Sequence, residues 1–111
     1  MKMDTEELEG GVTRIILTGD LDARGAGEID LSFQAVAASR SKVVVDLSGV
    51  GFLASIGIRT LIQAVKANAG KGGRLVVLDP AEPVWKVITT CGADSLLPMA
   101  HGLDAAVAAV A

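Results

Sequence analysis

The chain has 111 residues, a length typical of one domain, and its 13 acidic and 10 basic residues give a formal net charge of -3. A pI near 5.0 gives no basic surface of the kind that binds nucleic acid or inserts at an anionic membrane, so neither is expected as a partner. One cysteine excludes an internal disulfide, and no signal peptide or membrane-spanning apolar run is visible. These features predict a single domain over residues 1–111 in the cytoplasm.

The first elements expected are two strands joined by a glycine turn. Residues 6–9 and 12–18 flank Gly10-Gly11, and adjacent glycines suit a hairpin that needs positive φ. A helix is expected over residues 25–38, because apolar side chains recur there at helical spacing. Residues 43–47 are apolar except for Asp46, which is typical of a central strand buried on both faces.

A second helix follows with one apolar stripe, and Gly70 is placed just past its end as a C′ residue. That stripe is formed by Ile58, Leu61, Ile62, Val65 and Ala69. Residues 75–78 form another buried strand. The next helix starts near Pro83, lines one apolar face with Val84, Trp85, Ile88 and Cys91, and stops at Gly92. A short strand at Leu96-Leu97 and a helix over residues 103–110 complete the chain.

This order predicts an α/β fold: a mixed sheet that opens with a hairpin, continues with parallel strands and carries about four helices. Functional loops gather at the carboxyl ends of parallel strands. Three features occupy such ends, namely Asp20-Leu-Asp22, a loop over residues 48–55, and Asp79-Pro80. They are expected to form one surface. Asp46, inside its buried run, is expected to accept hydrogen bonds from nearby loop amides.

Ser55 stands at the start of the second helix. As an N-cap, its oxygen would accept a hydrogen bond from the backbone N–H of Gly57 or Ile58. The same place, over free N–H donors and the positive end of the helix dipole, also suits a phosphate on the hydroxyl. Both interpretations stay open at this point.

Three enzymatic patterns compete for the same surface, and each is weak. Gly49-Val-Gly51-Phe-Leu-Ala54 matches a dinucleotide-binding fingerprint, but the helical stripe begins only after Ala54. Asp20, Asp22 and Asp46 suggest a magnesium-dependent phospho-aspartate site, yet carboxylates at strand ends are usually turn formers or helix caps.

A Cys91–His101 nucleophile pair is the weakest of the three. Cys91 falls on an apolar helix face, where a thiol behaves as a small hydrophobe, and His101 lies in a terminal loop. The sequence therefore predicts no catalytic activity, no metal and no cofactor.

Five segments in order resemble the STAS domain of bacterial anti-sigma factor antagonists. They are residues 17–22 (LTGDLD), 43–50 (VVVDLSGV), 52–58 (FLASIGI), 72–78 (GGRLVVL) and 91–98 (CGADSLLP). The resemblance implies a regulatory protein that binds an anti-sigma factor of serine-kinase type and so releases a sigma factor. It also implies that phosphorylation of a serine at the start of the second helix turns this binding off, with a serine phosphatase as a further partner.

That serine falls on Ser55, although two neighbours depart from the family's pattern of Asp-Ser-Ser/Thr-Gly-Leu. Ala54 stands in place of the acid before the serine, and Ile56 in place of the hydroxyl after it. Ser55 is therefore predicted to be phosphorylated, or else to be only a cap in an adaptor subunit of a larger signalling or lipid-transport assembly. The expected partner-binding residues are Asp20, Asp22, Ser48, Gly49, Ala54, Ser55, Ile56, Gly57 and Arg59.

Overall fold

The computed structural model describes every residue from Met1 to Ala111. A five-stranded sheet has the order β1-β2-β3-β4-β5, with β1 antiparallel to β2 and all other neighbours parallel. The elements are β1 (Lys2–Leu8), the 3-10 turn η1 (Glu9–Gly11), β2 (Val12–Leu21), α1 (Ala23–Ser39), β3 (Lys42–Leu53), α2 (Ser55–Ala69), β4 (Arg74–Leu78), α3 (Glu82–Thr90), the 3-10 turn η2 (Ala93–Ser95), β5 (Met99–Ala100) and α4 (Leu103–Val110). The predicted mixed sheet with four helices is confirmed.

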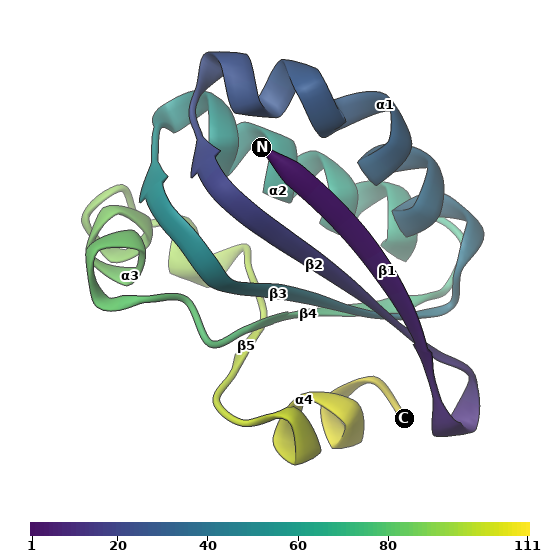
Figure 1. Ribbon diagram of the computed structural model, residues 1–111. Coiled ribbons are helices and arrows are strands. Elements are labelled where there is room, and N and C mark those ends of the chain that lie inside the picture. The colour runs from purple at the N-terminus through teal and green to yellow at the C-terminus, as the bar shows by residue number, and fades with distance from the viewer.

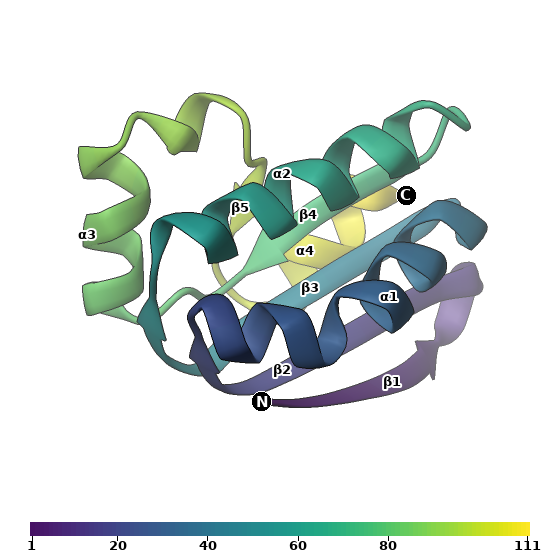
Figure 2. The same cartoon turned by 90° about the horizontal axis from the view of Figure 1, so that it is seen from above.

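The helices are divided unequally between the two faces of the sheet. Figures 1 and 2 show α1 and α2 side by side over one face, α3 at its edge, and α4 alone on the other face. The larger core cluster has 21 buried residues and lies under α1, α2 and α3, with Phe33 fully buried in it. The smaller cluster has six and joins α4 to the sheet through Ala106 and Val110. No helix is both long and apolar enough to cross a membrane.

The opening hairpin turns as expected. Gly10 and Gly11 have φ of 79° and 75°, a backbone conformation that glycine adopts without steric cost. The first strand is longer than predicted, because it begins at Lys2. Its side chains are mostly polar and exposed, so the spacing of apolar residues does not indicate that residues 2–5 belong to the strand.

The main correction concerns residues 48–53, which were predicted to be a loop and instead continue β3. Within β2 and β3, Ile16 pairs with Asp46 and Thr18 with Gly49, so two steps on β2 face three on β3. A second irregularity lies between Gly19 and Asp20. Each is a β-bulge, which bends a strand and adds a residue without ending the pairing.

Several smaller expectations also need correction. Leu96-Leu97 is not a strand, since the last strand is β5 and Pro98 precedes it. Gly70 ends α2 with helical angles rather than as a left-handed C′ residue. Cys91 is exposed just after α3 instead of lying on a buried helix face. The terminal helix, by contrast, has the predicted bounds.

Candidate functional site

The candidate site lies where β2 and β3 end and α1 and α2 begin. Leu21 pairs with Leu53 across the two parallel strands, and Asp20 pairs with Phe52. The Ala54 N–H then donates to the Leu21 carbonyl at 3.1 Å, which ties the start of α2 to the end of β2. Parallel strands end at the same edge of a sheet, so both helices start there together, as Figure 1 shows.

Two glycines allow this close approach. A Cβ on Gly57 would clash with the Leu21 carbonyl oxygen and would lie 2.7 Å from Leu53 Cδ1. A Cβ on Gly25 would clash with the Asp20 carbonyl oxygen. Both contacts are with backbone at the end of β2, which cannot move aside cheaply. Gly25 and Gly57 therefore hold the first turns of α1 and α2 against that strand.

Asp22 and Ser55 take different roles at the two helix starts. Asp22 is the N-cap of α1, and its Oδ1 accepts a hydrogen bond from Gly25 N–H at 2.8 Å. The interpretation of Ser55 as the N-cap of α2 is wrong: Ala54 holds that position, and Ser55 is the first helical residue. Gly57 and Ile58 donate to the Ala54 carbonyl instead, at 2.9 and 3.1 Å. The exposed Ser55 hydroxyl is thus left free of any capping bond.

Apolar side chains flank Ser55 on the surface. Phe52 is 53% exposed at the end of β3, and Ile56 is 38% exposed in the first turn of α2. Next to them, a groove of about 310 Å³ runs between α1 and α2. It is lined by Ala23, Ala26, Gly27, Asp30, Ile56, Arg59, Thr60 and Gln63. Phe52 was not among the predicted partner-binding residues, although an exposed aromatic at an interaction surface is a common anchor.

The structure brings together seven of the nine predicted partner-binding residues. Asp20, Asp22 and the segment 54–57 meet at the strand ends, and Arg59 lies one turn into α2. Ser48 and Gly49 do not belong to this group, because they lie inside β3, about 13–16 Å of strand before Leu53. Asp79 also lies apart. Its Oδ1 accepts from Gly102 N–H at 2.9 Å, which ties the end of β4 to the turn before α4.

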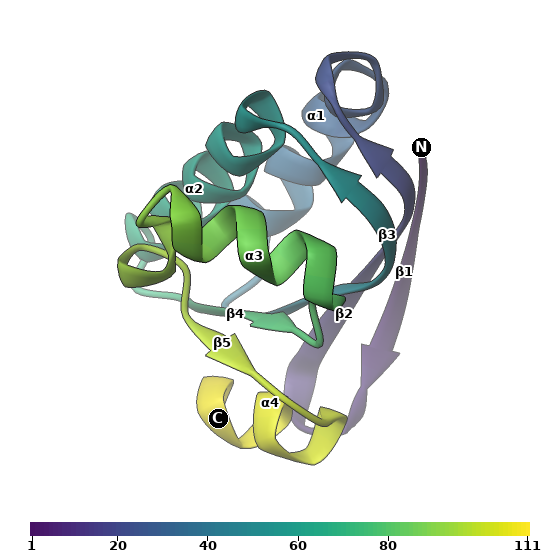
Figure 3. The same ribbon diagram turned by 90° about the vertical axis from the view of Figure 1, so that its left-hand side faces the viewer.

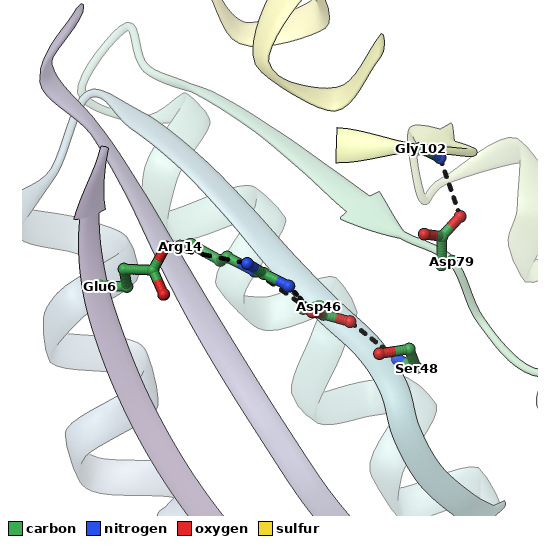
Figure 4. A network of polar contacts seen from close by, with 6 residues as sticks. All are labelled: Glu6, Arg14, Asp46, Ser48, Asp79 and Gly102. Atoms are coloured by element: carbon green, nitrogen blue, oxygen red, sulfur yellow. Dashed lines mark hydrogen bonds and ion pairs between the residues drawn. The ribbon is translucent and has the colours of Figure 1, made fainter. Parts of the chain in front are cut away.

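Asp46 is held in a polar chain on the face of the sheet opposite α1 and α2, shown in Figure 4. Its Oδ2 accepts from Arg14 Nη2 at 2.6 Å and from Arg14 Nε at 3.2 Å. Its Oδ1 accepts from Ser48 N–H at 2.9 Å, across the first bulge of β3. The expectation that Asp46 accepts from nearby amides is confirmed, and Arg14 is a partner that the sequence did not indicate.

The pKa of Asp46 reflects this surrounding. Burial of the carboxyl, which is 2% exposed, would raise its pKa, but the Ser48 N–H bond and the Arg14 guanidinium lower it more. The pKa is therefore held below its ordinary value. A charged Asp46 stabilises the bulge that leads β3 toward the site.

The residues of the three weak enzymatic patterns are not brought together in the structure as those patterns require. Gly49 and Gly51 lie within β3 and form no phosphate-cradling turn before α2. Asp46 is paired with Arg14 rather than grouped with Asp20 and Asp22, and no cluster of three His, Cys, Asp or Glu side chains is placed to hold a metal. His101 Nδ1 lies 3.7 Å from Asp79 Oδ1.

A family model described as "Mlab, STAS domain" matches residues 5–98. The chain belongs to the STAS domain family. The match includes all of the strand ends and helix starts that form the candidate site. No match is found among curated protein sequences.

Solved structures of STAS proteins share the fold. An anti-sigma factor antagonist from Mycobacterium paratuberculosis is 28% identical, with a TM-score of 0.88 over 98% of this chain and 92% of that one. An anti-sigma-factor antagonist (STAS) domain protein from Planctomyces limnophilus is 21% identical, with a TM-score of 0.82 over 96% of each chain. The phosphorylated form of the Bacillus cell fate determinant SpoIIAA is 17% identical, with a TM-score of 0.70 over 93% of each chain.

Proposed function

We propose that this STAS protein is an anti-sigma factor antagonist that binds an anti-sigma factor of serine-kinase type and is switched off by phosphorylation of Ser55. One observation carries the proposal: the Ser55 hydroxyl is exposed and unbonded at the first position of α2, next to the exposed Ile56. A cap hydroxyl would be engaged with backbone amides. This one is available to a kinase.

The contact surface is proposed to centre on Phe52 and Ile56, with charged residues around them. Asp20 and Asp22 make one side of this surface acidic, and Arg59 supplies a positive charge on α2. An apolar centre with a charged rim is the usual composition of a specific protein interface. The partner is expected to offer a complementary apolar side chain and a basic group facing the two aspartates.

A phosphate on Ser55 is compatible with the fold. The first turn of a helix favours negative charge, because its free N–H groups and dipole point at that position. Arg59 follows Ser55 by four residues, the spacing at which helical side chains are neighbours, so its guanidinium is expected to pair with the phosphate. Phosphorylation would thus remove Arg59 from partner contact as well as add charge.

The cost of phosphorylation would fall on the complex. A charge of about -1.5 to -2 would have to be buried between Phe52, Ile56 and the partner's apolar group. Poor pairing of such a charge costs roughly 2–5 kcal/mol, or a thirty- to several-thousand-fold loss of affinity. The proposal is supported by the similarity to SpoIIAA, which has been solved in both unphosphorylated and phosphorylated forms. A serine phosphatase would restore binding, and no catalytic step is assigned to this chain.

The test is to incubate the protein with its anti-sigma factor kinase and ATP, map the phosphate by mass spectrometry, and measure affinity before and after. Ser55→Ala should bind normally and resist phosphorylation, and Ser55→Asp should bind more weakly. Ser32→Ala, an exposed serine on α1, is the matched control and should change neither. A phosphate elsewhere, or unchanged affinity after Ser55 is modified, would refute the proposal.

A second candidate is a constitutive STAS adaptor in a larger signalling or lipid-transport assembly. The exposed Ile56, in place of a family hydroxyl, favours it because an apolar side chain suits permanent contact. This candidate predicts a stable complex with a partner that has no kinase activity. In that complex, Ser55→Asp and Ser55→Ala would bind alike.

A further inference from the structure

The far edge of β4 carries backbone groups without partners. Val77 N–H donates to the Pro98 carbonyl at 2.7 Å and Asp79 N–H to the Ala100 carbonyl at 3.1 Å, so these residues face β5. Arg74 N–H donates to Ser41 and faces β3. Because the direction alternates along a strand, Leu75 turns its N–H and C=O toward the side of β5, where no strand pairs with it.

This gap results from how β5 begins. β5 has only two residues and pairs only with Val77 and Leu78. Pro98 precedes it and has no N–H to offer a ladder. Leu75 is 6% exposed, and it lines the groove described below, so the side of β4 that carries its N–H and C=O borders open space rather than a strand. An unpaired strand edge is a template on which another strand can pair, so this part of β4 is open to main-chain hydrogen bonding.

A groove of about 330 Å³ lies along the same edge. It is bounded by Val65 and Ala69 of α2, Met99 of β5 and Ala109 of α4, and its only charged lining residue is Arg74. Figure 3 shows α2 and α4 on opposite sides of β4, with the edge of the strand between them. The Arg74 side chain is exposed, and its Nη1 donates only to the Ala111 carbonyl at 3.3 Å.

We propose that this edge binds an extended peptide segment of a partner protein, which adds to β4 as a short strand. The segment would supply a C=O and an N–H to Leu75, an apolar side chain to the groove and a carboxylate to Arg74. Strand addition of this kind draws affinity from main-chain hydrogen bonds and specificity from alternate side chains. β4 has three residues not paired with β5, Arg74 to Val76, so three or four residues would fill the site.

This peptide site is separate from the surface around Ser55. Ser55 is the first residue of α2 and Ala69 the last, and 15 helical residues span about 22 Å. The two surfaces can therefore be occupied at the same time. The inference does not depend on the proposed function, and variants at one surface should leave binding at the other unchanged.

The test uses the synthetic peptide acetyl-Glu-Val-Val-Ile-amide and the ¹⁵N-labelled full chain, titrated to about 5 mM because so short a segment binds weakly. We expect the Leu75 amide resonance to shift and its hydrogen exchange to slow by about tenfold at saturation. The same peptide with its central amide N-methylated should bind at least about tenfold more weakly. No shift at Leu75, or equal binding of the methylated peptide, would overturn the proposal.

Three variants test the groove itself. Ala109→Trp should fill it and abolish the Leu75 shift, whereas Ala105→Trp, also exposed on α4 but outside the groove, should not. Arg74→Glu should reverse the preference toward a peptide with lysine in place of glutamate. If both tryptophan variants bind the peptide alike, or if the free chain pairs with a second copy through this edge at the same concentration, a partner peptide is not the occupant.

Discussion

The two halves of β3 behave as different structures although they form one strand. Residues 43–46 pair with β2 on one side and β4 on the other, and Val43 to Val45 are fully buried. Residues 47–53 have only β2 beside them and contain both bulges. The first half is enclosed by the sheet, and the second extends beyond β4 to deliver the chain to Ser55.

We expect this difference to separate stability from the proposed partner contact along one continuous strand. The enclosed half contributes buried valines and the Arg14–Asp46 pair, which hold the sheet together. The extended half is anchored by Val50 and Leu53 but leaves Phe52 exposed. We therefore expect substitutions in the first half to lower stability, and exposed side chains of the second half to affect binding.

The largest expected effect is at Gly57, just beyond the extended half. Gly57→Ala would push a methyl group into the Leu21 carbonyl and the Leu53 side chain, and we expect a loss of about 3 kcal/mol of unfolding free energy. Gly51→Ala is the control, since a Cβ there has no neighbour closer than Asp20 Oδ1 at 3.9 Å, and it should change stability by less than about 0.5 kcal/mol. Urea denaturation measures both. Equal losses would mean that α2 is not held by close approach to β2.

The second prediction compares one substitution in each half of β3. Val45→Ala should lose about 2.5 kcal/mol, because two buried methyl groups are removed and a cavity remains. Phe52→Ala should stay within about 0.5 kcal/mol of the parent but weaken partner binding by tenfold or more. Denaturation and binding titrations on the same two proteins test this. A marked loss of stability in Phe52→Ala would show that the extended half is also structural.

The sequence predicts the strand of the enclosed half correctly and mistakes the extended half for a loop, because both predictions rest on local composition alone. Residues 43–47 form an unbroken apolar run around Asp46, which only a strand with two buried faces requires. Ser48, Gly49 and Gly51 then look like loop residues, because glycine and serine are rare in strand interiors. Their actual role is to form bulges, and a bulge is visible only once the paired strand is known.

In the candidate site, too, the sequence predicts where an element begins but not which individual hydrogen bonds form. The position of Ser55 near a helix start follows from the apolar stripe of α2, but whether it is the cap or the first helical residue depends on one hydrogen bond. Asp22 was foreseen as a possible cap and is one. The Arg14–Asp46 pair joins residues 32 apart, and the unpaired Leu75 depends on where β5 begins. Neither leaves a local sequence pattern.

A smaller effect is expected for charge on the proposed contact surface around Ser55. Arg59→Glu should weaken anti-sigma factor binding by about tenfold, since it replaces a rim cation with an anion, and should leave stability within about 0.5 kcal/mol. Lys66→Glu, an exposed lysine two turns further along α2, is the matched control and should bind normally. Titration of both variants against the same partner is the measurement. If Lys66→Glu weakens binding as much, net charge rather than the surface around Ser55 sets the affinity.

The smallest effect is a pH dependence that belongs to the enclosed half alone. The pKa of Asp46 is lowered in the folded chain, so its charged form stabilises the fold fully above the unfolded pKa of about 3.9. This contribution is lost as pH falls through the lower folded pKa. Asp46→Asn keeps an oxygen for Ser48 N–H but removes the charge beside Arg14. The stability gap between parent and variant should be constant from about pH 7 to 5 and shrink below about pH 4.

Urea denaturation of parent and variant at each pH gives this gap directly. Other carboxylates titrate in both proteins and cancel in the difference, which isolates Asp46. The matched control in the extended half is Asp20→Asn, an exposed aspartate, which should change the unfolding free energy at pH 7 by less than about 0.5 kcal/mol. A gap for Asp46→Asn that stays constant to about pH 3 would show that the Arg14–Asp46 pair does not stabilise the fold. In that case the two halves would differ in burial but not in electrostatics.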